Sequence, residues 1–202
     1  MRFMARIAGS LLASLLVLTS LAPLAPLASA QTPAAAGATL SVATGQSTVT
    51  YKLVHKFHTV AAVSKQVEGK ARILPDGKVQ VMVQAPVESF DSGNSNRDAH
   101  MKETVGAATH KLVSIKAVGE GVTIPTTFPT TVEKTFKGEL SFHGEKKPVE
   151  VPVKITFESA TQAKVTGEFQ ISLEAFKVER PSLMLVKVDD ALKLEVSLVF
   201  KS

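Results

Sequence analysis

The chain has 202 residues, no cysteine, no tryptophan and a net charge of +5. The lack of cysteine excludes a disulfide framework and an acylated lipoprotein, and one domain of this length can bury a core without such staples. The lysines are scattered singly among acidic and apolar residues, so the sequence lacks the basic cluster of a nucleic-acid-binding protein, and we expect no nucleic-acid partner.

The first thirty residues predict a signal peptide. Arg2 and Arg6 form a basic start, residues 7–18 are almost wholly apolar or small, and Ala28-Ser29-Ala30 offers the small-x-small pattern of a cleavage site. An uncleaved transmembrane anchor is the alternative, but two prolines interrupt the apolar run. We therefore expect cleavage after residue 30 and a periplasmic or secreted protein without stable membrane insertion.

After an Ala- and Pro-rich joint at residues 31–39, which we expect to be disordered, apolar and polar residues alternate as they do in β-strands. Alternating segments occur around residues 49–53, 67–73, 79–85, 132–140, 149–157, 165–171 and 192–200. Turn signals such as Pro75-Asp76-Gly77 and His143-Gly144-Glu145 separate them. About eight strands without helical crossovers predict an all-β antiparallel barrel or sandwich over residues 40–202. A single tyrosine and the polar outer faces argue against a transmembrane barrel.

One short helix is predicted between the strands, at about residues 96–105. Ser95 and Asp98 have the spacing of a capping box, and a glycine that fits a helix stop follows the segment. A helix of this length is marginal on its own, so we expect it to pack on the barrel through Met101 and Val105.

A dense polar block, Phe90-Asp91-Ser92-Gly93-Asn94-Ser95-Asn96-Arg97-Asp98-Ala99-His100-Met101, lies between two strand regions. It resembles the signature of the YceI-like family of periplasmic polyisoprenoid-binding proteins. Residues 138–144 with Lys147-Pro148-Val149, and Val188-Asp189-Asp190-Ala191-Leu192, agree with the family in order and spacing. The resemblance covers the chain from about Leu40 and implies a lipocalin-like barrel of eight antiparallel strands that holds a long isoprenoid chain.

Two segments depart from the family pattern. Family members usually carry aromatic residues and a Tyr-Pro pair where this chain has residues 105–110, and an Arg and a Gly where it has Leu173 and Lys177. The resemblance therefore leaves the width of the pocket and the identity of its ligand open.

The polar block allows two interpretations. Its Arg, Asp and His could form a catalytic or head-group cluster, or Arg97 could pair with a carboxylate such as Asp190 and fix the helix to the barrel. The second interpretation is favoured. The candidates for a structural or head-group role are Asn94, Arg97, Asp98, His100 and Asp190.

Five histidines raise the question of a metal site. His55 and His58 are the only close pair, and residues three apart on a regular strand point to opposite faces. Without cysteine, a His-Glu helix motif or a Gly-x-Ser-x-Gly elbow, we expect no metal, no catalytic residue and no enzyme activity. A metal-dependent enzyme that uses the histidines is a rival hypothesis.

The apolar strand faces supply the remaining candidates. Valine dominates the inward positions and large aromatic residues are scarce, so the barrel is predicted to be under-filled by its own side chains. The candidates for a tunnel wall are Val81, Val83, Val151, Val153, Ile155, Leu194 and Val196. We expect a bound isoprenoid-type lipid, such as a quinone or polyprenyl chain, and no other cofactor. The other rival is a ligandless envelope stress or interaction protein, which predicts a filled core.

Overall fold

A computed structural model describes residues 37–55, 58–180, 182–183 and 186–202. The predicted signal peptide, residues 1–30, and residues 31–36 of the predicted joint lie outside the described residues. The first strand begins at Ala38, within the segment that we expected to be disordered, and pairs there with Ile73.

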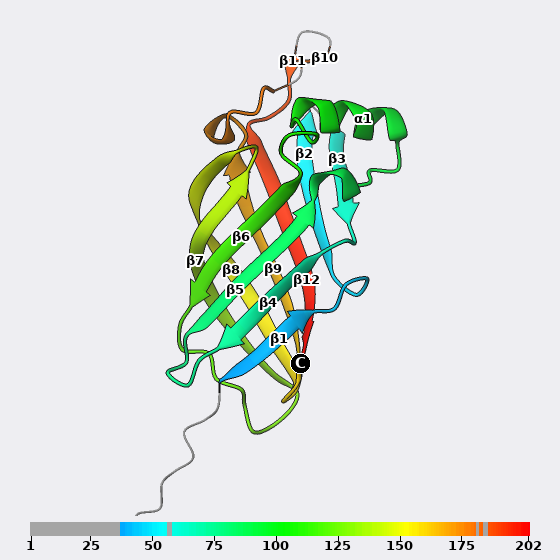
Figure 1. Cartoon of the computed structure of the whole chain (residues 1–202). Coiled ribbons are helices and arrows are strands. Elements are labelled where there is room, and N and C mark those ends of the chain that lie inside the picture. Colours follow the sequence, from blue (N-terminus) through cyan, green and yellow to red (C-terminus); the bar gives the residue numbers. More distant parts are fainter. Residues whose placement is uncertain (1–36, 56–57, 181, 184–185) are drawn as a thin grey trace, which may run out of the picture. The chain divides into compact units, whose positions relative to one another are not determined.

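Eight antiparallel strands close into a barrel (Figure 1). In the order of their pairing they are β1 (Ala38–Val42), β4 (Glu68–Ile73), β5 (Val79–Pro86), β6 (Leu112–Gly119), β7 (Thr130–Phe142), β8 (Glu145–Ser159), β9 (Gln162–Ser172) and β12 (Ala191–Lys201). The ring closes because β12 also pairs with β1. The predicted all-β, lipocalin-like barrel is thereby confirmed.

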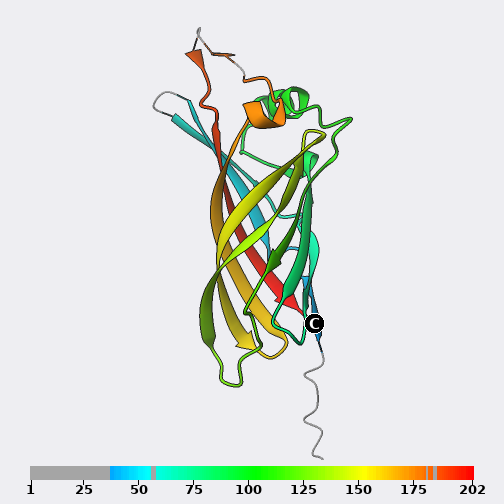
Figure 2. The same ribbon diagram turned by 90° about the vertical axis from the view of Figure 1, so that its left-hand side faces the viewer.

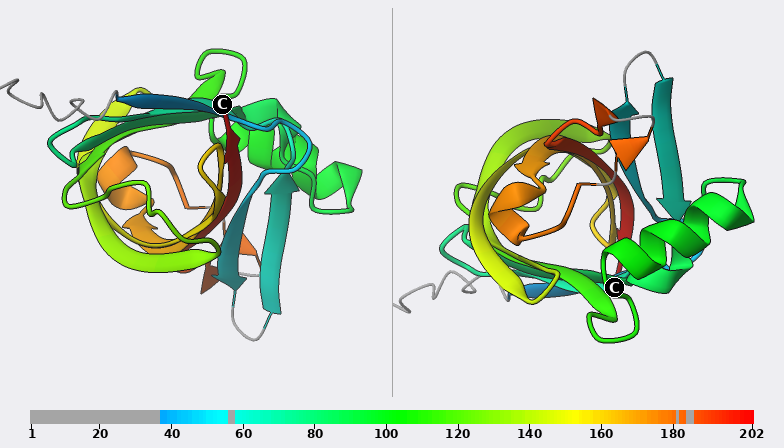
Figure 3. Two further views of the ribbon diagram at one scale, coloured as in Figure 1. Left: turned by 90° about the horizontal axis from the view of Figure 1, so that it is seen from below. Right: turned by 90° about the horizontal axis from the view of Figure 1, so that it is seen from above.

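The other elements gather at one end of the barrel, the upper end in Figure 1 and Figure 2. They are β2 (Thr48–His55), β3 (His58–Ser64), the short pair β10 (Ser182–Leu183) and β11 (Val186–Lys187), helix α1 (Ser95–Thr104), and the 3-10 turns η1 (Val87–Ser89) and η2 (Glu174–Phe176). Viewed along the barrel axis, the β2–β3 hairpin and α1 stand beside the ring, while η2 lies across its opening (Figure 3). Within the described residues, no helix is long and apolar enough to cross a membrane.

Strand β12 pairs with two different strands, β2 and β1, along the same edge. Its first part, Leu192–Ser197, pairs with β2, and its last residues, Phe200 and Lys201, pair with β1. The upper part of β12 therefore does not pair with β1. Likewise, β4 pairs with β5 only as far as Gln84, which leaves a gap in the upper barrel wall. No continuous ladder joins β3 to the segment after β5 in the described part of the chain; the contacts there are an isolated bridge, Val63 with Asp91, and a hydrogen bond between the Ser64 and Ser89 hydroxyls at 2.6 Å. The upper barrel wall is therefore completed between β3 and β5 by α1 rather than by a strand.

Both predicted turns are present. Leu74 N–H donates to the Lys78 carbonyl at 2.8 Å around Pro75-Asp76-Gly77. His143 and Gly144, with φ of 51° and 76°, form the two-residue connection between β7 and β8. Two positive φ values match the right-handed twist of a hairpin, which fixes the register of these two long strands.

The lower part of the barrel is packed with side chains. Phe136, Phe157 and Phe200 are each no more than 7% exposed and belong to one apolar cluster there. The Phe136 ring lies flat against Gly119, where a Cβ would come within 2.7 Å of three ring atoms. The glycine thus admits a large ring that helps to close this end of the interior.

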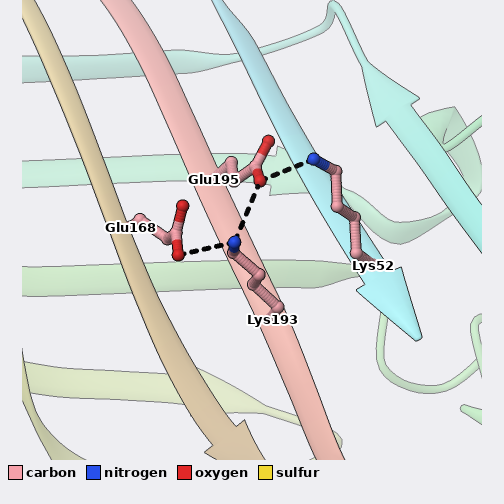
Figure 4. Close-up of polar contacts among 4 residues, drawn as sticks. All are labelled: Lys52, Glu168, Lys193 and Glu195. Atoms are coloured by element: carbon pink, nitrogen blue, oxygen red, sulfur yellow. Dashed lines mark hydrogen bonds and ion pairs between the residues drawn. The ribbon is translucent and has the colours of Figure 1, made fainter. Parts of the chain in front are cut away.

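Charged side chains on the outer face connect β2, β12 and β9 (Figure 4). Lys52 and Lys193 are direct register partners, a like-charge pair that would be unfavourable alone. Lys52 Nζ forms an ion pair with Glu195 Oε1 at 2.6 Å, and Lys193 Nζ forms one with Glu168 Oε1 at 2.6 Å. These contacts raise the pKa of Lys193 and lower that of Glu195. The two glutamates thus offset the repulsion between the two lysines.

Candidate functional site

A cavity of about 550 Å³ runs through the barrel interior. Residues from all eight barrel strands line it, and the lining side chains are almost all apolar. Every residue that we proposed for a tunnel wall lies on this lining: Val81, Val83, Val151, Val153, Ile155, Leu194 and Val196. That these side chains contact a ligand stays a prediction.

Sequence reasoning missed several lining residues. Tyr51 and Phe90 contact each other beneath α1, with ring centroids 5.5 Å apart. Leu173, Val178 and Val188 reach the cavity from the segment between β9 and β12. The alternation around residues 49–53 could have identified Tyr51, whereas the loop residues follow no period that predicts their direction.

The segment of residues 173–180, which we call the cap segment, covers the upper end of the cavity. Its lining residues Leu173 and Val178 are buried. Asp190 holds the segment: its carboxylate accepts the Glu174 N–H at 2.8 Å and its carbonyl accepts the Leu173 N–H at 2.9 Å. A hydrogen bond from the Ser172 side chain, followed by the Glu174 amide, lowers the pKa of Asp190.

The cap segment is also tied to the β7–β8 hairpin. His143 Nδ1 donates to the Phe176 carbonyl at 3.0 Å, and Lys177 Nζ lies 2.7 Å from Glu145 Oε1. Phe176 is 2% exposed and packs on Phe142. Lys177, where the family usually has Gly, adopts the left-handed conformation with φ of 56°. The departure from the family pattern therefore does not prevent the cap segment from closing.

Helix α1 begins one residue before our prediction and has a different cap. Asn94, rather than Ser95, is the N-cap, and its side chain accepts the Arg97 N–H at 3.0 Å. Asp98 makes no capping box with Ser95; it accepts the Ser92 N–H at 3.1 Å and the Ser92 hydroxyl. The expected packing of Met101 and Val105 on the barrel is confirmed.

Our suggested pairing of Arg97 with Asp190 is wrong. Arg97 Nε donates to the Ser92 hydroxyl at 2.8 Å, and Nη2 donates to the Ser92 carbonyl at 2.7 Å. Asp190 is engaged by the cap segment instead. Among the described residues Arg97 forms no ion pair, so its charge is not neutralised by a contacting carboxylate.

The cavity reaches the surface between the β2–β3 hairpin and α1, at a place that we call the side opening. Among the lining residues that the structure describes, only His58, Arg97 and His100 are exposed, and they come from β3 and α1. Tyr51, by contrast, is half-buried. Loss of solvation on burial, with a smaller contribution from the negative charge of Asp98, raises the pKa of Tyr51 to about 12. The hydroxyl of Tyr51 therefore stays protonated at neutral pH.

Our assumption that His55 and His58 share one regular strand is wrong. His55 and His58 do not lie on one strand; they end β2 and begin β3, where they are register partners. Elsewhere, the His110 and His143 rings approach with centroids 4.9 Å apart. No cluster of three or more potential metal-ligating side chains occurs among the residues described.

Comparison with known proteins identifies one family. The profile of the YceI-like domain matches residues 40–200. No curated protein matches the sequence.

Three solved structures share the fold. A polyisoprenoid-binding domain from Saccharophagus degradans, implicated in plant cell wall breakdown, has a TM-score of 0.67 at 14% identity, covering 81% of this chain and 98% of that one. BcnA of Burkholderia cenocepacia has a TM-score of 0.62 at 19% identity, covering 78% and 98%. The YceI protein of Campylobacter jejuni has a TM-score of 0.57 at 13% identity, covering 74% and 88%. At these identities the likeness concerns the fold.

Proposed function

Because the chain belongs to the family of YceI-like domains, we propose that its barrel binds and carries a long isoprenoid-type lipid, such as a quinone or polyprenyl chain, without catalysis. We further propose that the protein does so in the periplasm, after removal of the signal peptide. One similar structure is that of a polyisoprenoid-binding domain, which supports this ligand class.

The observation that carries the proposal is the apolar cavity of about 550 Å³ inside the barrel. Ligand pockets typically have volumes of roughly 300–1,000 Å³. A barrel of eight strands can be filled by side chains or can hold one ligand, and here valine and alanine positions leave space in the middle.

The size and the lining of the cavity favour a carrier over a ligandless barrel. Water is a poor occupant, since a buried water needs two to four polar partners. Burial of ten methylene groups contributes roughly 8 kcal/mol before ordering costs. A hydrocarbon chain is the occupant that this lining favours.

The direct experiment is chemical identification of the occupant. The exported protein is purified without detergent from a bacterial periplasm, and organic extracts are analysed by mass spectrometry. We expect one class of isoprenoid lipid to co-purify in stoichiometric amount. If no lipid co-purifies and the delipidated protein binds neither a quinone nor a polyprenol, the proposal is wrong and the function moves to the outer surface.

A further inference from the structure

The polar groups of the cavity are distributed unevenly. The barrel interior is almost wholly apolar, whereas the three exposed residues of the described lining, His58, Arg97 and His100, belong to β3 and α1 on either side of the side opening. From this asymmetry we infer that the side opening binds the head group of the lipid and that this head group is an anion, a phosphate or a carboxylate. The inference rests on the proposed function and adds the orientation and charge of the ligand.

The lining has one sign of charge. In the described lining the only charged residue is Arg97, the only imidazoles are those of His58 and His100, and no Asp or Glu is present. The Asp98 carboxylate lies close enough to raise the pKa of Tyr51, but it is only 8% exposed and accepts hydrogen bonds from the Ser92 amide and hydroxyl. An anion at the side opening therefore meets hydrogen-bond donors and a positive charge without facing a carboxylate on the cavity wall.

Arg97 is already oriented for this role. Two of its N–H groups are held by Ser92, which fixes the guanidinium plane. Its remaining N–H groups have no protein acceptor among the described residues. A guanidinium offers five donors in a fixed geometry that matches phosphate or carboxylate oxygens, and charge-assisted bonds to such anions are stronger than neutral ones.

The upper end of the barrel is a poorer place for the head group. The lining residues there, Leu173, Val178 and Val188, are apolar and buried beneath the cap segment. Burial of a charged group against them would carry a desolvation cost without compensating hydrogen bonds. The tail therefore extends from the side opening into the barrel, and its end lies toward the packed aromatic residues of the lower part.

The test compares ligands that share a tail and differ in the head. Delipidated protein is titrated with farnesyl phosphate and with farnesol, and palmitate serves as an anion with a different tail. We expect at least one anion to bind about tenfold more tightly than farnesol, with the preference shrinking as salt is raised. Farnesyl phosphate would indicate an isoprenoid phosphate as the source of the anion, and palmitate a fatty acid.

Substitutions at the side opening test whether the charge of Arg97 and the imidazole of His58 produce the preference for an anion. Arg97→Gln and the His58→Ala variant should reduce the preference for the anion without affecting farnesol, while Arg97→Lys should retain most of it. Lys137→Gln, a charge removal on the outer face, is the matched control and should change nothing.

Equal affinity of the wild-type protein for the anions and for farnesol would overturn the head-group inference and leave the carrier function standing. An anion preference that survives Arg97→Gln would equally overturn it. If none of the three ligands binds, the proposed function fails together with the inference.

Discussion

Asp98 accepts two hydrogen bonds from Ser92, one from its backbone N–H at 3.1 Å and one from its hydroxyl. Ser92 also receives the Arg97 side chain through its hydroxyl and carbonyl oxygens. Arg97 and Asp98, which are consecutive in the first turn of α1, thus both form hydrogen bonds with Ser92 in the preceding loop. Because α1 replaces a strand in the upper barrel wall, these contacts fix one side of the side opening.

Replacement of Asp98 by Asn should destabilise the protein at neutral pH. The Ser92 hydroxyl lowers the pKa of Asp98 in the folded protein. A depressed pKa contributes stability that is present above the unfolded-state value of about 3.9 and is lost as the pH falls through the folded-state value. Thermal unfolding of Asp98→Asn should therefore show a lower Tm at neutral pH and a weaker loss of Tm on acidification.

Glu103→Gln is the control for that substitution, since Glu103 is an exposed carboxylate on the same helix. Its Tm should follow the wild-type curve. Identical acid dependence of Asp98→Asn and the wild-type protein would show that the Ser92 contacts do not carry the effect.

The His143→Ala variant should loosen the cap segment. It removes the hydrogen bond from the imidazole to the Phe176 carbonyl, while the aromatic packing of Phe176 on Phe142 remains. We expect faster hydrogen exchange at the amides of residues 176–178 and faster release of a bound lipid, with the barrel strands unaffected. Lys146→Ala, in the same hairpin but outside this contact, should exchange like the wild-type protein. Unchanged exchange in His143→Ala would mean that packing alone holds the cap segment.

Lys177→Gly should stabilise the protein slightly. The left-handed conformation costs a non-glycine residue about 1–2 kcal/mol, whereas the ion pair of Lys177 with Glu145 is exposed to solvent and therefore contributes little. Relief of backbone strain should therefore exceed the loss of the pair, and urea unfolding should show a small increase in the free energy of unfolding, reduced by the greater chain entropy of glycine. Lys177→Ala loses the pair and keeps the strain, so it should be less stable than Lys177→Gly. The reverse order would show that the ion pair dominates.

The barrel and its apolar lining could be predicted because both depend on a period of two. Inward positions such as Val151, Val153 and Ile155 recur at every second residue of one long strand, so their common face follows from strand geometry. The two-residue turn at His143-Gly144 could be predicted for a similarly local reason, since its residues tolerate positive φ.

The side opening could not be predicted in this way. It depends on which strands pair along β12, and a periodic pattern does not show that β2 and β1 share one edge. The partner of Arg97 was mistaken for a related reason: several carboxylates were available in the sequence, but the loop geometry brings Ser92 to the guanidinium and η2 to Asp190. Contacts between loops follow from the closed fold rather than from sequence spacing.

Native mass spectrometry of three proteins can show whether the ligand lies inside the barrel. In Val81→Phe/Val153→Phe, two aromatic rings occupy the cavity, whereas Val118→Phe places one ring at a position that is 44% exposed. We expect the wild-type protein and Val118→Phe to retain the mass of a bound lipid, and the doubly substituted protein, still folded, to lose it. Equal lipid occupancy in all three proteins would contradict binding in the barrel interior.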